Sequence, residues 1–235
     1  MQAAGRVVAD AIRAMRAHVQ PGVTTRELDR VGGRVFARAG ARSGPQLDYG
    51  FPGVNCISVN DQAVHGIPNS RRLREGDLVK LDVTAELDGF YADACVSVPV
   101  GNASRSAQKL AAVSRKALNR GMSVARAGVP INHVGRAVEQ AVIAQGCSVC
   151  TDLLGHSIGR RIHEQPNIPS YDAPGYDQPL TDGLVITIEP IIAAGQGAVV
   201  DGGDGWTIKT RDGSWSAHTE HTIVITHGAP LILTA

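Results

Sequence analysis

Two aspartates, Asp82 and Asp93, lie on apolar segments that flank Asp88-Gly89, a residue pair typical of a tight β-hairpin turn. A two-residue turn places Asp93 opposite Thr84, and a four-residue loop places it opposite Asp82. Because side chains alternate between the faces of a strand, either register puts both carboxylates on one face. Like charges repel across a strand pair, so we expect a cation between them. On this pair alone, Lys80 on the same face is the favoured cation, and a metal ion is the alternative.

Three further side chains favour the metal. Glu189 follows the apolar run 184–188, and Glu220 precedes the apolar run 222–225. A carboxylate at the end of a buried strand is costly unless it is paired or coordinating. His156 lies between two glycines, where the backbone can approach another group closely. Four carboxylates and one imidazole suit Mn²⁺, Fe²⁺, Co²⁺ or Zn²⁺, and the four negative charges balance two divalent ions, so we predict a two-metal site.

The composition excludes several other classes of protein. The chain has 235 residues, 43% of them hydrophobic and 19% charged, which indicates a folded chain, and we expect one catalytic domain over residues 1–235. A formal net charge of +1 gives no basic surplus for nucleic acid, and no apolar run is long enough to span a membrane. Cys147 and Cys150 form a lone CxxC without the second pair that a zinc site needs, so we interpret them as packing residues, and the four cysteines fit a reducing, cytoplasmic setting.

Hydrophobic periodicity predicts the elements that must position these residues. We expect helices over residues 3–18, 24–40, 104–126 and 132–145. We expect strands over 54–59, around 64–65, and over 78–85, 90–98, 184–190, 205–210 and 219–226, with strand and turn over 148–160 and a Pro/Gly-rich loop over 164–183. Two helix pairs and several antiparallel hairpins indicate an α+β fold.

A weak internal repeat relates the two halves of the chain. Gly22-Val23 leads into a predicted helix that ends at Gly40, and Gly128-Val129 leads into one that ends at Gly146, both at an offset of 106. Such a repeat predicts two similar halves that face each other, with a site on the seam between them.

Six short motifs, in this order, resemble those of type I methionine aminopeptidases, members of metallopeptidase family M24 with the pita-bread fold. The motifs are Val64-His-Gly-Ile-Pro68, Leu81-Asp-Val-Thr84 with Ala92-Asp93, Gly155-His-Ser-Ile-Gly-Arg160, Ile162-His-Glu-Gln-Pro166, Thr187-Ile-Glu-Pro190 and Glu220-His-Thr-Ile-Val224. The similarity extends from residue 1 almost to the C-terminus. As a set the motifs are highly specific, although several of them also occur in prolidases and aminopeptidase P.

The resemblance implies a role for each matching residue. It implies two divalent ions held by Asp82, Asp93, His156, Glu189 and Glu220, with Asp93 and Glu220 as the bridging pair. Glu189 would also carry the proton of the attacking water, His65 would contact the scissile amide, and His163 would contact the substrate carbonyl. The resemblance further implies that the methionine side chain lies among Cys56, Phe51 and Trp206.

The function implied by the resemblance is removal of the N-terminal methionine from nascent proteins and peptides that have a small second residue, by hydroxide attack from the dinuclear site. Ile162 and Thr219 stand where aromatic residues are usual, which we expect to thin the aromatic lining and weaken the preference for methionine. The expected partner is a peptide or nascent-chain N-terminus, with the ribosome as a further candidate and a monomer as the default state.

Three alternatives share the fold. An X-Pro-cleaving peptidase or a prolidase-like enzyme is the first, although these usually carry an additional N-terminal domain. A type II enzyme is disfavoured because the 26 positions from His163 to Glu189 leave no room for its helical insertion. A non-catalytic binding module of this fold would have lost ligands, whereas all five are present here.

Overall fold

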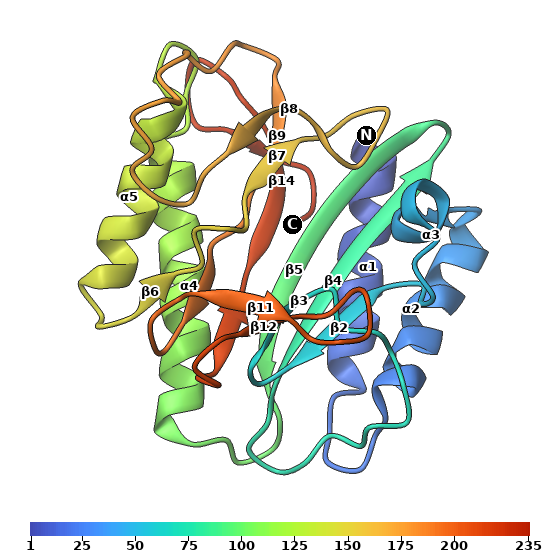
Figure 1. The fold of residues 1–235 in the computed structure, drawn as a ribbon. Helices are drawn as coiled ribbons and strands as arrows, with labels where there is room; N and C mark the ends of the chain where they lie inside the picture. The colour runs from blue at the N-terminus through green and yellow to red at the C-terminus, as the bar shows by residue number, and fades with distance from the viewer.

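The computed structural model describes all residues from Met1 to Ala235, and two helix pairs flank a central antiparallel sheet (Figure 1). The helices are α1 (Gln2–Ala17), α2 (Thr25–Ala39), α3 (Gly44–Tyr49), α4 (Arg105–Val124) and α5 (Ile131–Ile143). The strands are β1 (Arg42–Ser43), β2 (Cys56–Val59), β3 (Gln62–Val64), β4 (Leu78–Leu87), β5 (Phe90–Pro99), β6 (Ser148–Val149), β7 (Gly155–Ser157), β8 (Glu164–Ile168), β9 (Val185–Ile188), β10 (Ile191–Ala193), β11 (Val199–Asp201), β12 (Ile208–Thr210), β13 (Ser216–His218), β14 (Glu220–Val224) and β15 (Leu231–Ile232).

The main sheet joins the two halves of the chain. It has nine strands in the order β1-β4-β5-β14-β9-β7-β8, with β2 also pairing with β4 and β15 with β14. Strand β14 lies between β5 and β9, so a strand near the C-terminus is bonded to one strand from each half. The predicted α+β class is confirmed, and the centre of the sheet is where the two halves meet.

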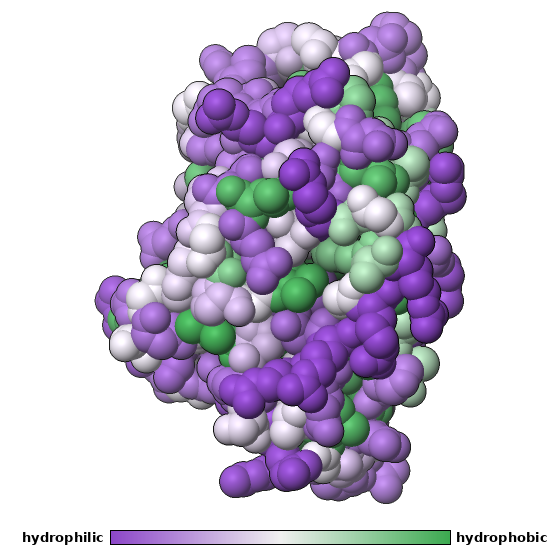
Figure 2. All heavy atoms as spheres, turned by 90° about the vertical axis from the view of Figure 1, so that its right-hand side faces the viewer, coloured by the Kyte–Doolittle hydropathy of each residue, from purple (hydrophilic) through white to green (hydrophobic).

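Each helix pair has its own hydrophobic core. Helices α1 and α2 cover β4 and β5 over a cluster of 19 buried residues, and α4 and α5 cover the β9–β14 side over a cluster of 20. The outward face of α2 is polar, with Arg26, Arg30 and Arg34 exposed, and Figure 2 shows that this side of the molecule is mostly hydrophilic. The chain therefore buries one stripe of each helix and leaves the other in water.

The internal repeat is visible in the backbone. Gly22 donates its N–H to the carbonyl of Leu73 at 2.7 Å, and Gly128 donates to the carbonyl of Leu180 at 2.8 Å. Both glycines have φ near +90°, a conformation that a side chain disfavours. In each half the same turn therefore ties the start of the second helix to the segment that precedes a distant strand, β4 in one half and β9 in the other, as two similar halves require.

Local sequence signals account for most element boundaries. Thr24 and Glu27 form a reciprocal capping box at the start of α2, and Gly40 ends that helix in the left-handed conformation. Two departures from the expected elements bear on the surroundings of the site. The expected loop 164–183 contains the edge strand β8, which tolerates Pro166 because an edge strand leaves some N–H groups unpaired. Helix α3, with Ser43 as its cap, was not predicted because it is only six residues long.

No helix in the structure is both long enough and apolar enough to cross a membrane.

Candidate metal centre

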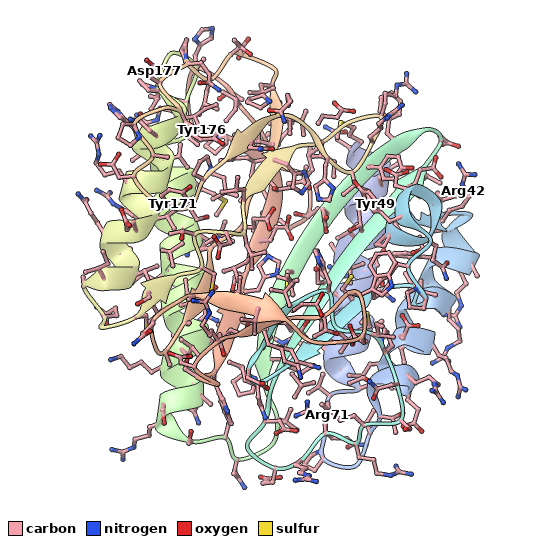
Figure 3. The ribbon with its side chains drawn as sticks, in the orientation of Figure 1. Arg42, Tyr49, Arg71, Tyr171, Tyr176 and Asp177 are labelled. Atoms are coloured by element: carbon pink, nitrogen blue, oxygen red, sulfur yellow. The ribbon has the colours of Figure 1, made fainter.

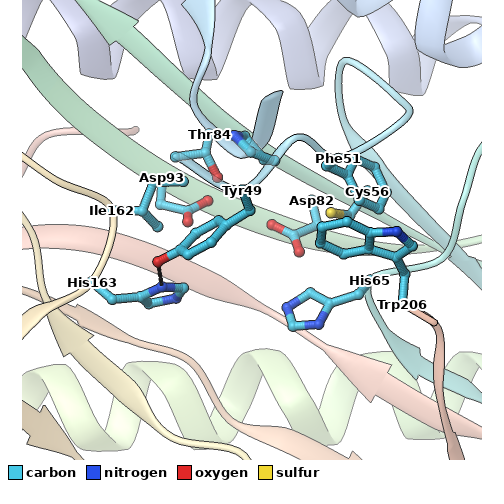
Figure 4. A pocket seen from close by; sticks show the side chains of 11 residues that line it. Tyr49, Phe51, Cys56, His65, Asp82, Thr84, Asp93, Ile162, His163 and Trp206 are labelled. Atoms are coloured by element: carbon cyan, nitrogen blue, oxygen red, sulfur yellow. Dashed lines mark hydrogen bonds between the residues drawn. The ribbon is translucent and has the colours of Figure 1, made fainter. Parts of the chain in front are cut away.

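The β4–β5 hairpin turns through two residues. Asp93 lies opposite Thr84 and Asp82 lies opposite Cys95, so both carboxylates project from the same face of the hairpin, as expected. Figure 4 shows the two side chains directed into the same pocket. Of the two registers that the sequence left open, the structure therefore has the one with a two-residue turn.

Lys80 is not the cation between them, which corrects the interpretation favoured for the hairpin alone. Its ammonium is buried and donates to the carbonyl of Asn60 at 2.8 Å and to the carbonyl of Ser216 at 3.1 Å. The side chain therefore links β4 to the β2–β3 turn and to β13. Lys80 therefore does not neutralise the charge of Asp82 and Asp93.

Burial lowers the pKa of Lys80 to about 7, against an unfolded value near 10.5. Between these pH values the unfolded chain binds a proton that the folded chain lacks, so the free energy of unfolding rises with pH. We expect a rise of up to about 1.4 kcal/mol per pH unit between pH 7 and 8.5 that Lys80→Met removes. Urea unfolding of the metal-free proteins at several pH values measures the difference. Parallel curves for the two proteins would contradict this assignment.

Three more acceptors meet the aspartates at the seam of the two halves. Glu189 directly follows β9, Glu220 begins β14, and His156 is in β7. One ligand atom each of Asp93, His156 and Glu220 lie within 4.8 Å of one another, and Nε2 of His156 is 3.5 Å from Oε1 of Glu189. The five predicted ligands, called here the donor set (Asp82, Asp93, His156, Glu189 and Glu220), all line one cavity.

The donor set is poorly satisfied by protein alone. Oδ1 of Asp93 and Oε1 of Glu220 are buried and accept no hydrogen bond. Burial, and then neighbouring carboxylates, raise the pKa values of Asp82, Glu189 and Glu220 well above their usual range. Burial raises the pKa of Asp93 to about 6.

Clustered buried carboxylates of this kind are costly unless a cation compensates them. Burial, followed by the nearby His163, lowers the pKa of His156 to about 3, so its imidazole is neutral and able to coordinate. Oxygen-rich donors with one imidazole fit divalent metal ions and do not fit a thiolate-type site.

Hydrogen bonds with a neighbouring residue, Thr187, fix the orientation of two of the donors. The Thr187 hydroxyl donates to Oε1 of Glu189 at 2.9 Å and accepts the backbone N–H of His156 at 3.1 Å. Gly155 allows this close approach, because a Cβ there would lie 2.9 Å from the carbonyl of Thr187. Close packing against Thr187 therefore explains why a glycine precedes His156.

A pocket of about 250 Å³ opens beside the two aspartates. Its lining includes the three residues expected to hold an apolar side chain, Phe51, Cys56 and Trp206, and the rings of Phe51 and Trp206 meet edge to face at 5.2 Å. Asp204 accepts the backbone N–H of Trp206 and so holds the loop that carries it. The pocket is therefore aromatic and apolar at one end and carboxylate-lined at the other.

Two histidines that were expected to contact the substrate, His65 and His163, line the same pocket. His65 has a φ of +55°, which is unusual for a residue with a side chain and is found at functional positions. Gly66 follows it, and a Cβ there would lie 2.3 Å from the carbonyl of Ile57. His163 lies with its ring 4.3 Å from that of His156, and its Nδ1 is 2.5 Å from the hydroxyl of Tyr49.

Two residues of the site were missed by the sequence analysis. Tyr49 comes from α3, and it lies on the side of that helix that faces the sheet, whereas Arg42 lies at the outer edge (Figure 3). Tyr49 gave no signal because α3 itself was not predicted. His218 is buried beside Glu189 and Glu220, and its place two residues before Glu220 could have indicated a shared strand face.

Thr219 lies outside the pocket, which corrects the expectation that it thins the aromatic lining. It precedes Glu220 and projects to the opposite face, where its hydroxyl accepts a hydrogen bond from Ser114. Ile162 does line the pocket, as expected. The four cysteines are free; Cys150 is buried and Cys147 half-buried, and neither of these two lines the pocket.

Residues 1–227 match metallopeptidase family M24. The chain belongs to this family. It is 44% identical to methionine aminopeptidase 2 of Bacillus subtilis over 98% of this chain and 93% of that protein. The crystal structure of a methionine aminopeptidase from Thermotoga maritima matches with a TM-score of 0.97 at 36% identity, covering 100% of this chain and 94% of that one.

The M24 assignment confirms the pita-bread fold and the resemblance to methionine aminopeptidases, and it identifies the chain as a metallopeptidase, a hydrolase that uses divalent metal ions. A prolidase from Pyrococcus furiosus matches with a TM-score of 0.78 at 21% identity, and this chain covers 62% of its length. That likeness shows the fold alone.

Proposed function

We propose that this M24 hydrolase is a methionine aminopeptidase. It would remove the N-terminal methionine from peptides and nascent chains, with a small residue preferred at the second position. The observation that carries the proposal is the junction of an apolar pocket lined by Phe51, Cys56 and Trp206 with the donor set. A substrate whose first side chain fills that pocket brings its first peptide bond to the carboxylates.

We assign the five members of the donor set as ligands of two divalent ions. When bound, such ions supply a Lewis acid for the peptide carbonyl and lower the pKa of a water molecule. Asp93 and Glu220 suit a shared position because each has one buried oxygen without a protein partner. Since both halves of the chain contribute donors, we propose that residues 1–235 act as one catalytic domain.

Three residues of the chain would act on protons and hydrogen bonds. Glu189 is held by Thr187 through one oxygen, which leaves its carboxylate placed to take a proton and to return it to the leaving amine. His65 would hold the scissile amide. His163 would donate to the substrate carbonyl, where negative charge develops.

The orientation of His163 has a visible cause. Burial lowers its pKa, so the ring is neutral. If Tyr49 donates to Nδ1, the remaining ring proton is on Nε2, because a neutral imidazole carries only one. The side of the ring away from Tyr49 is then a hydrogen-bond donor.

Tyr49→Phe removes this control of the tautomer while it keeps the aromatic ring. We expect kcat to fall about tenfold, roughly 1.4 kcal/mol, with metal affinity unchanged, since His163 is outside the donor set. Steady-state kinetics on a Met-Ala peptide and titration with Mn²⁺ measure the two quantities. An unchanged kcat would show that the contact is structural only.

A peptide panel tests the function itself. Met-Ala-x, Met-Leu-x, Leu-Ala-x and x-Pro-x peptides are assayed with Mn²⁺, Co²⁺, Fe²⁺ or Zn²⁺ added. We expect Met-Ala-x to be cleaved with a kcat/KM about 10–200-fold above that of Leu-Ala-x, the range that an apolar pocket provides. Met-Leu-x is expected to be poor, and x-Pro-x to be at background. Equal cleavage of the Leu and Met peptides, or a preference for x-Pro-x, would overturn the proposal.

A further inference from the structure

His218 is a buried histidine beside the donor set to which the proposed function gives no role. It ends β13, where it lies opposite Ile191, and only 2% of its surface is exposed. Its backbone is fixed by Ser97, whose hydroxyl accepts the N–H of His218 at 2.9 Å and donates to its carbonyl at 2.8 Å. These two bonds therefore fix the backbone of His218, and the ring that it carries is buried beside the donor set.

The ring reaches two glutamates at once. Its Nε2 is 3.7 Å from Oε2 of Glu189 and 3.6 Å from Oε2 of Glu220. Neither ring nitrogen has a hydrogen-bond partner, and Oε1 of Glu220 has none either. A buried donor that is left unpaired costs about 1–3 kcal/mol, so this ring is expected to have a partner in the working protein.

The positions of the atoms favour a contact to the carboxylates over direct coordination. The ligand atoms that come together within 4.8 Å belong to Asp93, His156 and Glu220, and His218 is not part of that group. The nitrogen of His218 instead lies beside the Oε2 atoms of Glu189 and Glu220, less than 1 Å beyond hydrogen-bond length. Carboxylates that bind a metal are usually held by such outer contacts.

We propose that His218 is a positioning residue, whose Nε2–H donates to the Oε2 oxygens of Glu189 and Glu220 and holds both carboxylates in the orientation that binds the metal ions. This inference rests on the proposed function, because it takes the two glutamates as ligands. It deepens that function by adding a sixth side chain, from β13, that acts through the ligands and does not touch the ions.

Two substitutions separate the effect of losing the N–H donor from the effect of losing the volume of the ring. His218→Leu keeps an apolar side chain of similar size and removes the N–H, whereas His218→Gln keeps an N–H donor of similar reach. Titration calorimetry with Co²⁺ measures affinity, and the visible absorption of the bound Co²⁺ reports its coordination. We expect His218→Leu to bind Co²⁺ 10–100-fold more weakly than the wild type and His218→Gln to bind within a few fold of it.

A matched control is available three residues further on, in the next strand. His221→Leu makes the same substitution in β14 at a side chain that bonds Thr234, and Thr234 lies outside the pocket. We expect this variant to keep wild-type Co²⁺ affinity. Thermal unfolding of all four metal-free proteins shows which of them are folded, and His218→Gln keeps the proposal testable should the Leu variant not fold.

The outcomes are distinct. Weak binding by His218→Leu with recovery in His218→Gln and an unchanged Co²⁺ spectrum supports the positioning role. Wild-type affinity in His218→Leu overturns it, as does an equal loss in both variants with an altered spectrum, which would make His218 a direct ligand. A wild-type protein that binds no Co²⁺ at all would instead reject the proposed function.

Discussion

Asp93→Asn is expected to lower kcat/KM for a Met-Ala peptide by at least about 1,000-fold, a loss of roughly 4 kcal/mol of transition-state stabilisation. The substitution is nearly isosteric, so the β4–β5 hairpin keeps its register. It removes the negative charge of the residue that meets His156 and Glu220 within 4.8 Å. An amide oxygen is a much weaker ligand than a carboxylate, so a divalent ion held as proposed would lose one of its two shared donors.

The same substitution is expected to stabilise the metal-free protein. Burial raises the pKa of Asp93 to about 6, so near pH 7.5 the folded chain holds a buried charge that the unfolded chain exposes to water. Neutral Asn removes that cost, and we expect a melting temperature higher by roughly 5 °C. Loss of activity together with a gain in stability separates a functional carboxylate from a structural one.

Asp88→Asn is the matched control. Asp88 is in the turn of the same hairpin with a φ of +54°, a conformation that Asn accepts readily. We expect wild-type activity and an unchanged melting temperature for this variant. Near-wild-type turnover by Asp93→Asn with saturating Mn²⁺ would remove Asp93 from the donor set.

Removal of divalent ions is the second change with a large expected effect. Dialysis against a chelator is expected to abolish peptide hydrolysis, and Mn²⁺ is expected to restore it. At 100-fold excess over its dissociation constant, the ion stabilises the folded chain by about 2.7 kcal/mol, which corresponds to a melting temperature higher by roughly 5–10 °C. The five donors meet only in the folded protein, so the unfolded chain offers the ion no equivalent site.

The size of this stabilisation is expected to depend on pH. Asp82, Glu189 and Glu220 have raised pKa values in the folded metal-free chain, and that of Asp93 is about 6. A raised carboxylate pKa gives stability that is fully present below the unfolded value near pH 4 and is lost as pH rises through the folded value. The metal-free protein should therefore become less stable between pH 5 and 7, while ion binding, which displaces these protons, becomes tighter.

Melting curves with and without Mn²⁺ at pH 5.5 and pH 7.5 measure this dependence. We expect the ion-induced rise in melting temperature to be clearly larger at pH 7.5. An equal rise at both pH values would show that the carboxylates are already ionised in the metal-free state, which the burial of the site contradicts.

The meeting of the donor-set side chains in one place could be predicted because its signals are local. Alternation along a strand puts Asp82 and Asp93 on one face with either turn length. A glutamate at the end of an apolar run is also recognised locally, because burial of its unpaired charge would be costly. The fold class followed in the same way from helical and strand periodicity. The M24 resemblance added the role expected of each donor, such as Asp93 and Glu220 as the bridging pair, which spacing alone does not indicate.

The errors come from contacts made across the fold. Lys80 shares a face with the aspartates in the sequence pattern, but the carbonyls of Asn60 and Ser216 draw its ammonium to another part of the sheet. Thr219 is next to a donor in sequence and therefore faces away from it in a strand. Tyr49 enters the site on a helix too short to show periodicity.

His218 was missed for a related reason. A histidine two residues before a predicted ligand could have been placed on the same strand face, yet the sequence does not say which two carboxylates its ring would reach. Only the pairing of β13 with β10 brings the ring to Glu189 as well as to Glu220.

Anomalous diffraction from crystals soaked in manganese tests the central proposal most directly. We predict two anomalous peaks within coordination distance of the donor set, with Asp93 and Glu220 contacting both ions. An absence of anomalous density among Asp82, Asp93, His156, Glu189 and Glu220, or peaks bound elsewhere on the chain, would contradict it.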